Sequence, residues 1–142
     1  MSSLRLLLPL TAVAASLALP AAAGAGGGER VFFPGDCETN AYKPRTITVA
    51  CADGNFQVRR ISWTTYGSSS ARGTGTARVN DCQPTCAGGR FRNYPARVVL
   101  SRVTQCGDVP QFRRLAVTFT RTRPRGFSVT ERRSTPCADA PE

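Results

Sequence analysis

The sequence predicts a small all-β domain, an antiparallel β-sandwich or a partly open barrel of five to seven strands stapled by disulfides. Three observations support this fold. Glycine, proline and Asx residues divide the chain into short segments rich in Val, Ile, Thr and aromatic residues. No segment carries the apolar stripe of an amphipathic helix. Six cysteines in a chain of 142 residues, an even number in a small protein, indicate three disulfides.

The start of the chain has the features of an export signal. Arg5 precedes an apolar run that ends at Leu19, and small residues follow at the spacing that signal peptidase requires. The run is short, and Pro9 within it and Pro20 directly after it argue against a membrane anchor. We therefore expect residues 1–25 to be a signal peptide. Residues 26–142 should form a single secreted β domain with a flexible amino-terminal tail and no transmembrane segment.

The first expected strands form a hairpin. Residues 45–51, RTITVAC, alternate as a half-buried strand does, and the ADGN that follows contains the Asp-Gly pair of a tight turn. The next strand, residues 55–67, changes its apolar phase at Arg59-Arg60. Because strict register would turn half of its apolar side chains outward, we expect a bulge or bend at that pair. Residues 30–33 can add a short edge strand.

The strand expected over residues 68–80 has an apolar face made of very small side chains, in the pattern ARGTGTARV. A bulky group must press against such a face, and the single tryptophan, Trp63, is the obvious candidate. Residues 95–103, 112–120 and 126–131 complete the set of strands. Within the second of these the phase changes at Arg113-Arg114, where we expect another kink.

The cysteine pattern CQPTC at Cys82–Cys86 indicates a structural staple. A zinc site needs four ligands, usually in two close pairs or with histidine, and this chain has no histidine. Redox motifs place two residues, not three, between the cysteines, at the start of a helix. We expect no metal and no cofactor. Spacing does not fix the pairing. We favour Cys37 with Cys51, Cys82 with Cys86, and Cys106 with Cys137, and a link from Cys51 to Cys82 or Cys86 is the main alternative.

The residue types exclude most catalytic mechanisms. Without histidine there is no Ser-His-Asp or Cys-His catalysis and no ordinary general base near neutral pH. No phosphate-binding or dinucleotide-binding loop occurs. A carboxylate pair could still hydrolyse glycosides, but turns and loops explain most of the available carboxylates. These carboxylates are Asp36, Glu38, Asp53, Asp81, Asp108 and Glu131.

Arginines are the remaining candidates for a binding site. The chain has a net charge of +10, and 18 of its 19 basic residues are arginine, with Lys43 as the exception. Such a charge attracts polyanions. Candidate binding residues are the strand arginines that should face water, together with a pair at a kink, although a solvated face that maintains solubility is the simpler explanation. They are Arg72, Arg78, Arg97, Arg113 and Arg114.

Aromatic residues suggest two further hypotheses about binding. Exposed Phe or Tyr beside such arginines could stack bases, as in proteins that bind single-stranded nucleic acid. Trp63 and Tyr66 could form a platform for a sugar, although we expect Trp63 to belong to the core.

The stretch from Arg45 to Phe119 resembles a family of small secreted actinobacterial proteins without an assigned function. The resemblance lies in the ACADG hairpin at residues 50–54, the tryptophan-containing strand, the ARGTG strand at residues 71–75 and the NDCQPTCAGG loop from Asn80. It implies export and a common disulfide-stapled β domain. It brings no catalytic residues, and it favours pairing of Cys106 with Cys137.

These observations together predict a secreted, monomeric, non-catalytic domain that binds an extracellular protein or a polyanionic envelope component. A secreted protease inhibitor is the first alternative. It would present Gln83, Pro84 and Thr85 on a loop whose disulfide lowers the entropy cost of docking. A histidine-free carboxylate hydrolase is the second.

Overall fold

The computed structural model describes residues 28–138. The predicted export signal and most of the glycine tail lie outside these residues. The described part is all-β and antiparallel, as the sequence predicts, and contains no helix. Its strands are β1 (Phe33–Pro34), β2 (Asn40–Ala41), β3 (Thr46–Thr48), β4 (Phe56–Tyr66), β5 (Ser70–Asn80), β6 (Phe91–Cys106), β7 (Val109–Phe119) and β8 (Thr130–Ser134).

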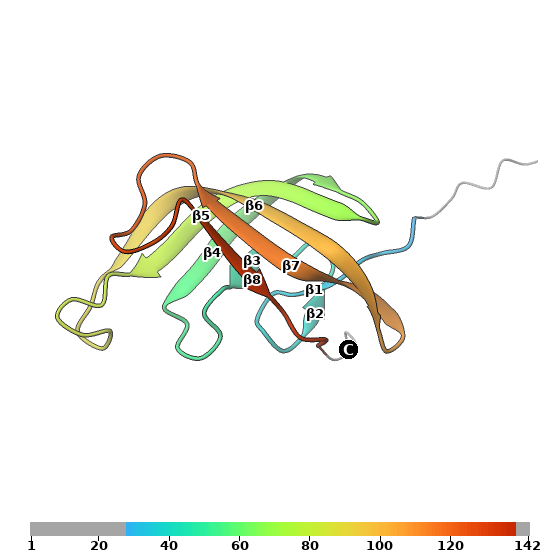
Figure 1. The fold of residues 1–142 in the computed structure, drawn as a ribbon, viewed down its shortest axis with the longest axis horizontal. Coiled ribbons are helices and arrows are strands. Elements are labelled where there is room, and N and C mark those ends of the chain that lie inside the picture. Colours follow the sequence, from blue (N-terminus) through green and yellow to red (C-terminus); the bar gives the residue numbers. More distant parts are fainter. Residues whose placement is uncertain (1–27, 139–142) are drawn as a thin grey trace, which may run out of the picture.

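Six of the strands form one sheet in the sequential order β3-β4-β5-β6-β7-β8, and β1 and β2 form a second, small sheet. The large sheet curls into a half-barrel that arches over β1 and β2 (Figure 1). Of the two architectures expected, the partly open barrel is therefore the one adopted. The core fills the concave side, where Ile47, Val58, Val98, Leu100 and Val117 are fully buried.

The amino-terminal segment bridges the open side of the half-barrel. The amide of Phe32 donates to the carbonyl of Pro110 at 2.9 Å, and the amide of Phe112 donates back to Phe32 at 2.9 Å. A few residues later the carbonyl of Gly35 accepts a hydrogen bond from Thr48 of β3 at 2.7 Å. The segment thus runs from β7 to β3, and it carries Phe33 into the core.

Strand β4 contains the bulge that its apolar phase predicts. Arg59 pairs with Thr76 and Ser62 with Thr74, so two residues of β4 lie opposite the single residue Gly75. Arg60 is the first of the two and has a φ of 53°, in the left-handed region. The extra residue restores Ile61 to the core. A second register shift follows between Trp63 and Thr65.

The kink expected in β7 takes a different form. The phase of the buried residues does change between Phe112 and Leu115, yet the pairing of β6 with β7 keeps one register on both sides of Arg113. The irregularity lies in the partner strand, where Arg102 has a φ of 58° and belongs to no registered pair. The strand pair therefore bends without an inserted residue.

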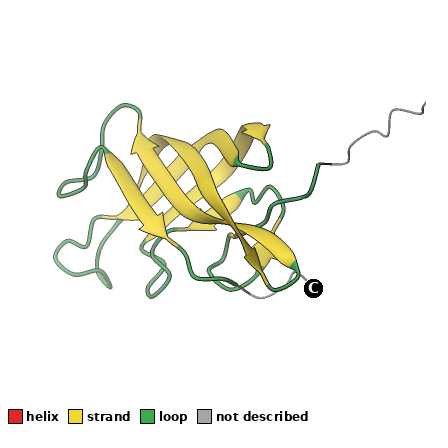
Figure 2. Ribbon diagram, turned by 45° about the vertical axis from the view of Figure 1, so that its right-hand side comes forward, coloured by secondary structure: helices red, strands yellow, loops and turns green. Residues whose placement is uncertain are grey.

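Figure 2 shows the strands and the loops that join them, and some strand boundaries differ from the expected ones. β3 is only three residues long, because the chain leaves the sheet at Val49 to form a wide loop around Gly54. β8 begins at Thr130, four residues later than expected. The preceding Phe127 packs edge-on against Phe56 and Phe119 and closes one end of the core.

Three disulfides hold loops and the carboxy-terminal segment, which strand pairing does not fix. They have the pairing that we favoured from the sequence: Cys37–Cys51, Cys82–Cys86 and Cys106–Cys137. The last one fixes the carboxy-terminal segment to the end of β6. The side chain of Gln111, which is fully buried, holds the same segment by donating to and accepting from the backbone of Ala138 at 2.7 and 3.0 Å.

Candidate functional site

The convex face of the large sheet is basic. Residues that pair directly across an antiparallel sheet share a face, and Arg97 pairs with Thr74 of β5 and Thr118 of β7. Following these pairs across the sheet places six arginines on the face opposite the core. The only carboxylate in the described strands, Glu131, pairs with the buried Val117 and so belongs to the other face. The six are Arg59, Arg72, Arg78, Arg97, Arg114 and Arg132.

A groove of about 390 Å³ lies on this face beside the β4 bulge. It spans four adjacent strands, β3 to β6. Its walls carry three guanidinium groups, two hydroxyl groups and one amide, and no carboxylate. The residues are Arg59, Arg60, Arg78, Thr46, Thr76 and Asn93.

Strand register explains why these side chains meet. Arg59 lies directly between Thr46 of β3 and Thr76 of β5, and Arg78 lies opposite Asn93 of β6. Directly opposite residues have Cβ atoms about 5 Å apart, and diagonal neighbours about 7 Å apart. Two neighbouring rows of the sheet therefore supply five of the six residues, and the bulge supplies Arg60.

Two of the three arginines have unusual local environments. Arg60 occupies the left-handed region at φ 53°, which costs a non-glycine residue about 1–2 kcal/mol. The guanidinium carbon of Arg78 lies 3.4 Å from the ring centroid of Phe91, in a stacked cation–π contact. Phe91 is exposed on the same face. Stacking fixes the plane of the guanidinium and leaves its N–H groups at the edge free to donate.

The charge of the groove is not neutralised by the protein. Within residues 28–138 the only ion pairs are Arg92 with Asp81 and Arg133 with Glu131. Three cations in one groove repel one another, and an anion bound between them would remove that repulsion. Chemically, the arrangement can bind an oxyanion through many N–H and O–H donors.

The structure brings together some of the predicted binding residues and separates others. Arg72, Arg97 and Arg114 lie on the convex face outside the groove, and Arg78 lines it. Arg113 lies apart from these residues, against the carboxy-terminal segment. It is half-buried, donates to the carbonyl of Thr135 at 2.6 Å and contacts the sulfur of Cys137 at 3.2 Å, so it holds the carboxy-terminal segment.

Arg59 and Arg60 are not among the binding residues predicted from the sequence, yet both line the groove. The signal was present in the phase change, because a bulge places two successive side chains beside one residue of the partner strand and is frequent at binding sites. The contribution of Thr46, Thr76 and Asn93 had no local signal, because it depends on which strands are neighbours.

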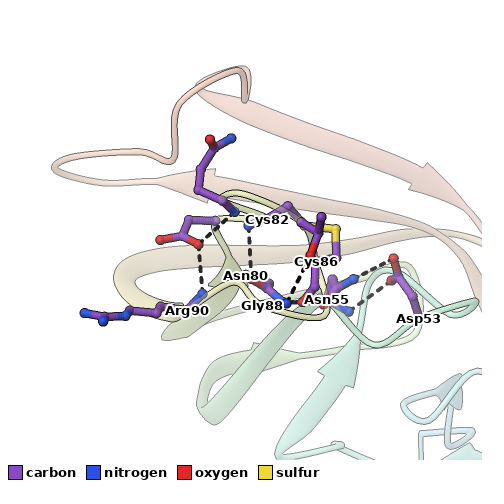
Figure 3. Close-up of a disulfide and its surroundings, with 10 residues drawn as sticks. Asp53, Asn55, Asn80, Cys82, Cys86, Gly88 and Arg90 are labelled. Atoms are coloured by element: carbon purple, nitrogen blue, oxygen red, sulfur yellow. Dashed lines mark hydrogen bonds between the residues drawn. A yellow bond between two sulfur atoms is a disulfide. The ribbon is translucent and has the colours of Figure 1, made fainter.

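The Cys82–Cys86 ring projects from the sheet as a rigid loop held by the buried Asn80 (Figure 3). The amide nitrogen of Asn80 donates to the carbonyl of Cys86 at 2.7 Å and to the side chain of Asn55 at 2.9 Å. Its oxygen accepts from the backbone of Cys82 at 3.0 Å. The tip of the ring, Gln83 to Thr85, is exposed.

Asp53 and Asp81 stabilise loops, as the sequence predicts, and Asp36 does so as well. Asp81 accepts hydrogen bonds from the backbone amides of Arg90 at 2.8 Å and Gln83 at 3.3 Å, which lower its pKa. Backbone amides likewise lower the pKa of Asp36, chiefly that of Thr39, and of Asp53. A general acid in glycoside hydrolysis needs a raised pKa, so these three carboxylates are poorly suited to that role.

Trp63 and Tyr66 belong to an aromatic cluster that packs the end of the half-barrel. The indole nitrogen of Trp63 donates to the carbonyl of Pro44 at 3.0 Å. Tyr66 lies edge-on between Trp63, Tyr42 and Phe112, and its burial raises its pKa to about 12. Trp63 pairs with Gly73 of β5, and its ring lies against that glycine, which confirms its expected role. Both rings are partly buried, which leaves little of either available as a sugar platform.

A second hollow of about 310 Å³ lies between the small sheet and β3. Its charged residues are Asp36 and Arg45, of opposite sign, and small side chains and proline form most of the remaining wall. It has no comparable surplus of charge. In the part of the chain that the structure covers, no three metal-ligating side chains come together.

Comparison with known protein families, curated proteins and solved structures finds no match for this chain. The part of the chain that the structure describes contains no apolar helix of membrane-spanning length. All six cysteines form disulfides. These bonds fit a protein that lies outside the reducing cytoplasm.

Proposed function

We propose that this protein is a secreted, monomeric, non-catalytic β domain that binds a polyanionic component of the cell envelope or the extracellular space. Membership of the small secreted actinobacterial proteins is part of the same proposal. The observation that carries it is the convex face, on which six arginines share a curved surface to which the described strands contribute no carboxylate. Fields from like charges on one face add up and attract a polymer of opposite charge.

The curvature of the convex face favours a flexible polymer over a compact molecule as the ligand. The arginines are spread over five strands, β4 to β8, in rows that follow the strand pairing. Neighbouring strands are about 4.8 Å apart, so the outermost arginines are separated by roughly 20 Å. A flexible chain of anionic groups can follow such a surface and contact several arginines at once.

Retention on immobilised heparin tests the proposal. The wild-type protein should elute between about 0.1 and 0.5 M salt, because binding releases counterions. The test variant is Arg72→Gln/Arg97→Gln/Arg114→Gln. It should elute at a clearly lower salt concentration and show a shallower dependence of log K on log[salt].

The matched control removes the same charge from the loop between β7 and β8, in the variant Arg121→Gln/Arg123→Gln/Arg125→Gln. These three residues are also exposed. The control should elute close to the wild type. Equal loss of retention in both variants would mean that net charge, and not the convex face, governs binding, and the proposal would fail.

The Cys82–Cys86 ring favours one second candidate, an inhibitor of secreted proteases. The supporting observation is that Asn80 immobilises the ring while its tip is exposed. Titration of a subtilisin-type protease with the wild type, and with a variant in which Gln83, Pro84 and Thr85 are replaced together, tests this function. Inhibition that the replacement abolishes supports it, and an unaffected protease rejects it.

A further inference from the structure

The groove beside the β4 bulge differs from the rest of the convex face in its donor chemistry. Elsewhere on the face the arginines lie singly among threonine, serine and apolar residues. In the groove, three guanidinium groups converge with two hydroxyls and an amide. Each guanidinium has five N–H donors and no acceptor. The groove is thus a site rich in hydrogen-bond donors and positive charge.

We propose that this groove is a specific subsite for a tetrahedral oxyanion, the phosphate or sulfate ester group of the bound polymer. This inference rests on the proposed function and names the chemical group that it recognises. Arg59, Arg60 and Arg78 bind the oxyanion in forked pairs of hydrogen bonds, as guanidinium groups do with phosphate. Thr46 and Thr76 donate from either side of Arg59.

The shape of the anion follows from the direction of the donors. Thr46, Arg59 and Thr76 come from three adjacent strands in one row, and Arg78 comes from the next row. Donors that approach from several directions need acceptors on several sides of the ligand. A tetrahedral group offers three or four oxygens at wide angles, whereas a carboxylate offers two in one plane. The groove therefore discriminates in favour of phosphate or sulfate.

Two features of the protein preorganise the subsite. Arg78 is held against Phe91 at 3.4 Å, so it loses little side-chain freedom when it binds a ligand. Arg60 stays in the left-handed region although it is not glycine. Backbone strain of this kind persists where the surrounding structure holds it, often at functional sites. The Arg60 conformation is what brings a third cation to the groove.

Small anions test the subsite directly. The thermal midpoint and the binding isotherm of the full secreted chain are measured with sodium phosphate, sodium sulfate and sodium acetate at matched ionic strength. A ligand that binds only the native state raises the midpoint. Phosphate or sulfate should raise it in a saturable way and acetate should not, and the tighter of the two identifies the ester. Equal shifts with all three anions would overturn the proposal.

A variant that keeps the net charge distinguishes specific binding in the groove from attraction by the charge of the whole convex face. Thr46→Val/Thr76→Val removes two hydroxyl donors and keeps every arginine. It should weaken phosphate or sulfate binding about tenfold. The matched control Thr65→Val/Thr74→Val alters two exposed threonines of the same face outside the groove, and it should bind as the wild type does. Similar affinities of test and control variants would overturn the subsite.

Failure of the subsite and failure of the proposed function give different results. If heparin and polyphosphate are retained through the convex arginines but the two threonine variants behave alike, the subsite is wrong and the polyanion function stands. If phosphate or sulfate binds in the groove but neither polymer is retained, the polyanion function is wrong and the subsite stands.

Discussion

The ring of Trp63 lies directly against the backbone of Gly73 on the neighbouring strand. A Cβ atom placed on Gly73 would lie 3.0 Å from Cε3 of Trp63 and 2.6 Å from the carbonyl oxygen of Ser62. Both distances are shorter than ordinary contacts of a methyl group. The second is to backbone, which cannot move without disturbing the pairing of β4 with β5.

Gly73→Ala should therefore destabilise the protein, although alanine usually stabilises a strand relative to glycine. Overpacking of this kind costs about 1–3 kcal/mol. Urea denaturation at neutral pH measures the loss. Gly67→Ala is the control, since the nearest atom to its new Cβ would be the carbonyl oxygen of Ser70 at 3.7 Å. A neutral effect of Gly73→Ala would show that β4 and β5 can separate locally.

Arg60→Gly should raise stability and lower binding at the same time. Glycine adopts a φ of 53° without the steric cost of about 1–2 kcal/mol that arginine has. Its greater loss of backbone freedom on folding offsets part of that gain, so the free energy of unfolding should rise by about 0.5–1 kcal/mol. Retention on heparin should fall because the groove loses one cation. The control Arg72→Gly lies in regular strand and should lose about 1 kcal/mol of stability. A loss of stability in both variants would contradict the backbone strain inferred at Arg60.

Asn80→Ala should loosen the Cys82–Cys86 ring and destabilise the domain. The substitution removes three hydrogen bonds from a buried amide and leaves the carbonyl of Cys86 and the amide of Cys82 without these partners, at a total cost of about 2–3 kcal/mol. Asn93→Ala, on the exposed face of β6, should change stability by less than about 0.5 kcal/mol. Urea denaturation and amide exchange at Cys82 provide the measurements. Protection of Cys82 that is unchanged in Asn80→Ala would show that the disulfide alone holds the ring.

Tyr66 should make the native protein lose stability in alkaline solution. Its pKa is raised from 10.0 to about 12, so the folded protein keeps a proton that the unfolded chain releases. The free energy of unfolding should then be unaffected below pH 10 and fall as the pH rises from 10 toward 12. The phenolate absorbance of the folded protein should show one late-titrating tyrosine that is missing in Tyr66→Phe. A Tyr66→Phe protein with the same late signal would assign it to another ring.

The three disulfides should contribute unequally to stability. Their sequence separations are 14, 4 and 31 residues, and chain entropy gives contributions of about 3, 2 and 3.7 kcal/mol respectively. The double variants Cys106→Ala/Cys137→Ala and Cys82→Ala/Cys86→Ala test this order by their thermal and urea midpoints. The first should be the less stable. The reverse order would indicate that contacts of the small ring, and not loop closure, dominate its contribution.

Local patterns in the sequence predict much of the fold. The alternation of apolar residues locates β4 and β5 to within two residues, and the phase change at Arg59-Arg60 locates the bulge. The pattern fails where a long-range contact decides the outcome. Residues 126–129 alternate as a strand does, but Phe127 is drawn out of the sheet by its packing on Phe56 and Phe119.

The candidate site is predicted only in part, because it depends on strand order. Parity alone identifies Arg72, Arg78 and Arg97 as residues that face water. The convergence of Arg78 with Thr46 requires that β3, β4 and β5 be neighbours, which no local pattern specifies. Arg113 shows the opposite error: it was expected to bind a ligand, but it contacts Cys137, which is 24 residues away in sequence.

The inserted residue of β4 lets one strand serve both faces of the sheet. If the same sequence ran as a regular strand, alternation from Val58 onward would turn Ile61 and Trp63 toward solvent and Ser62 into the hydrocarbon interior. Deleting Arg60 would instead remove the insertion and its cation together, and Arg59, Ile61, Ser62 and Trp63 would then alternate without a bulge. A one-residue change in length can therefore add or remove this positive charge during evolution while the hydrophobic interior keeps its composition.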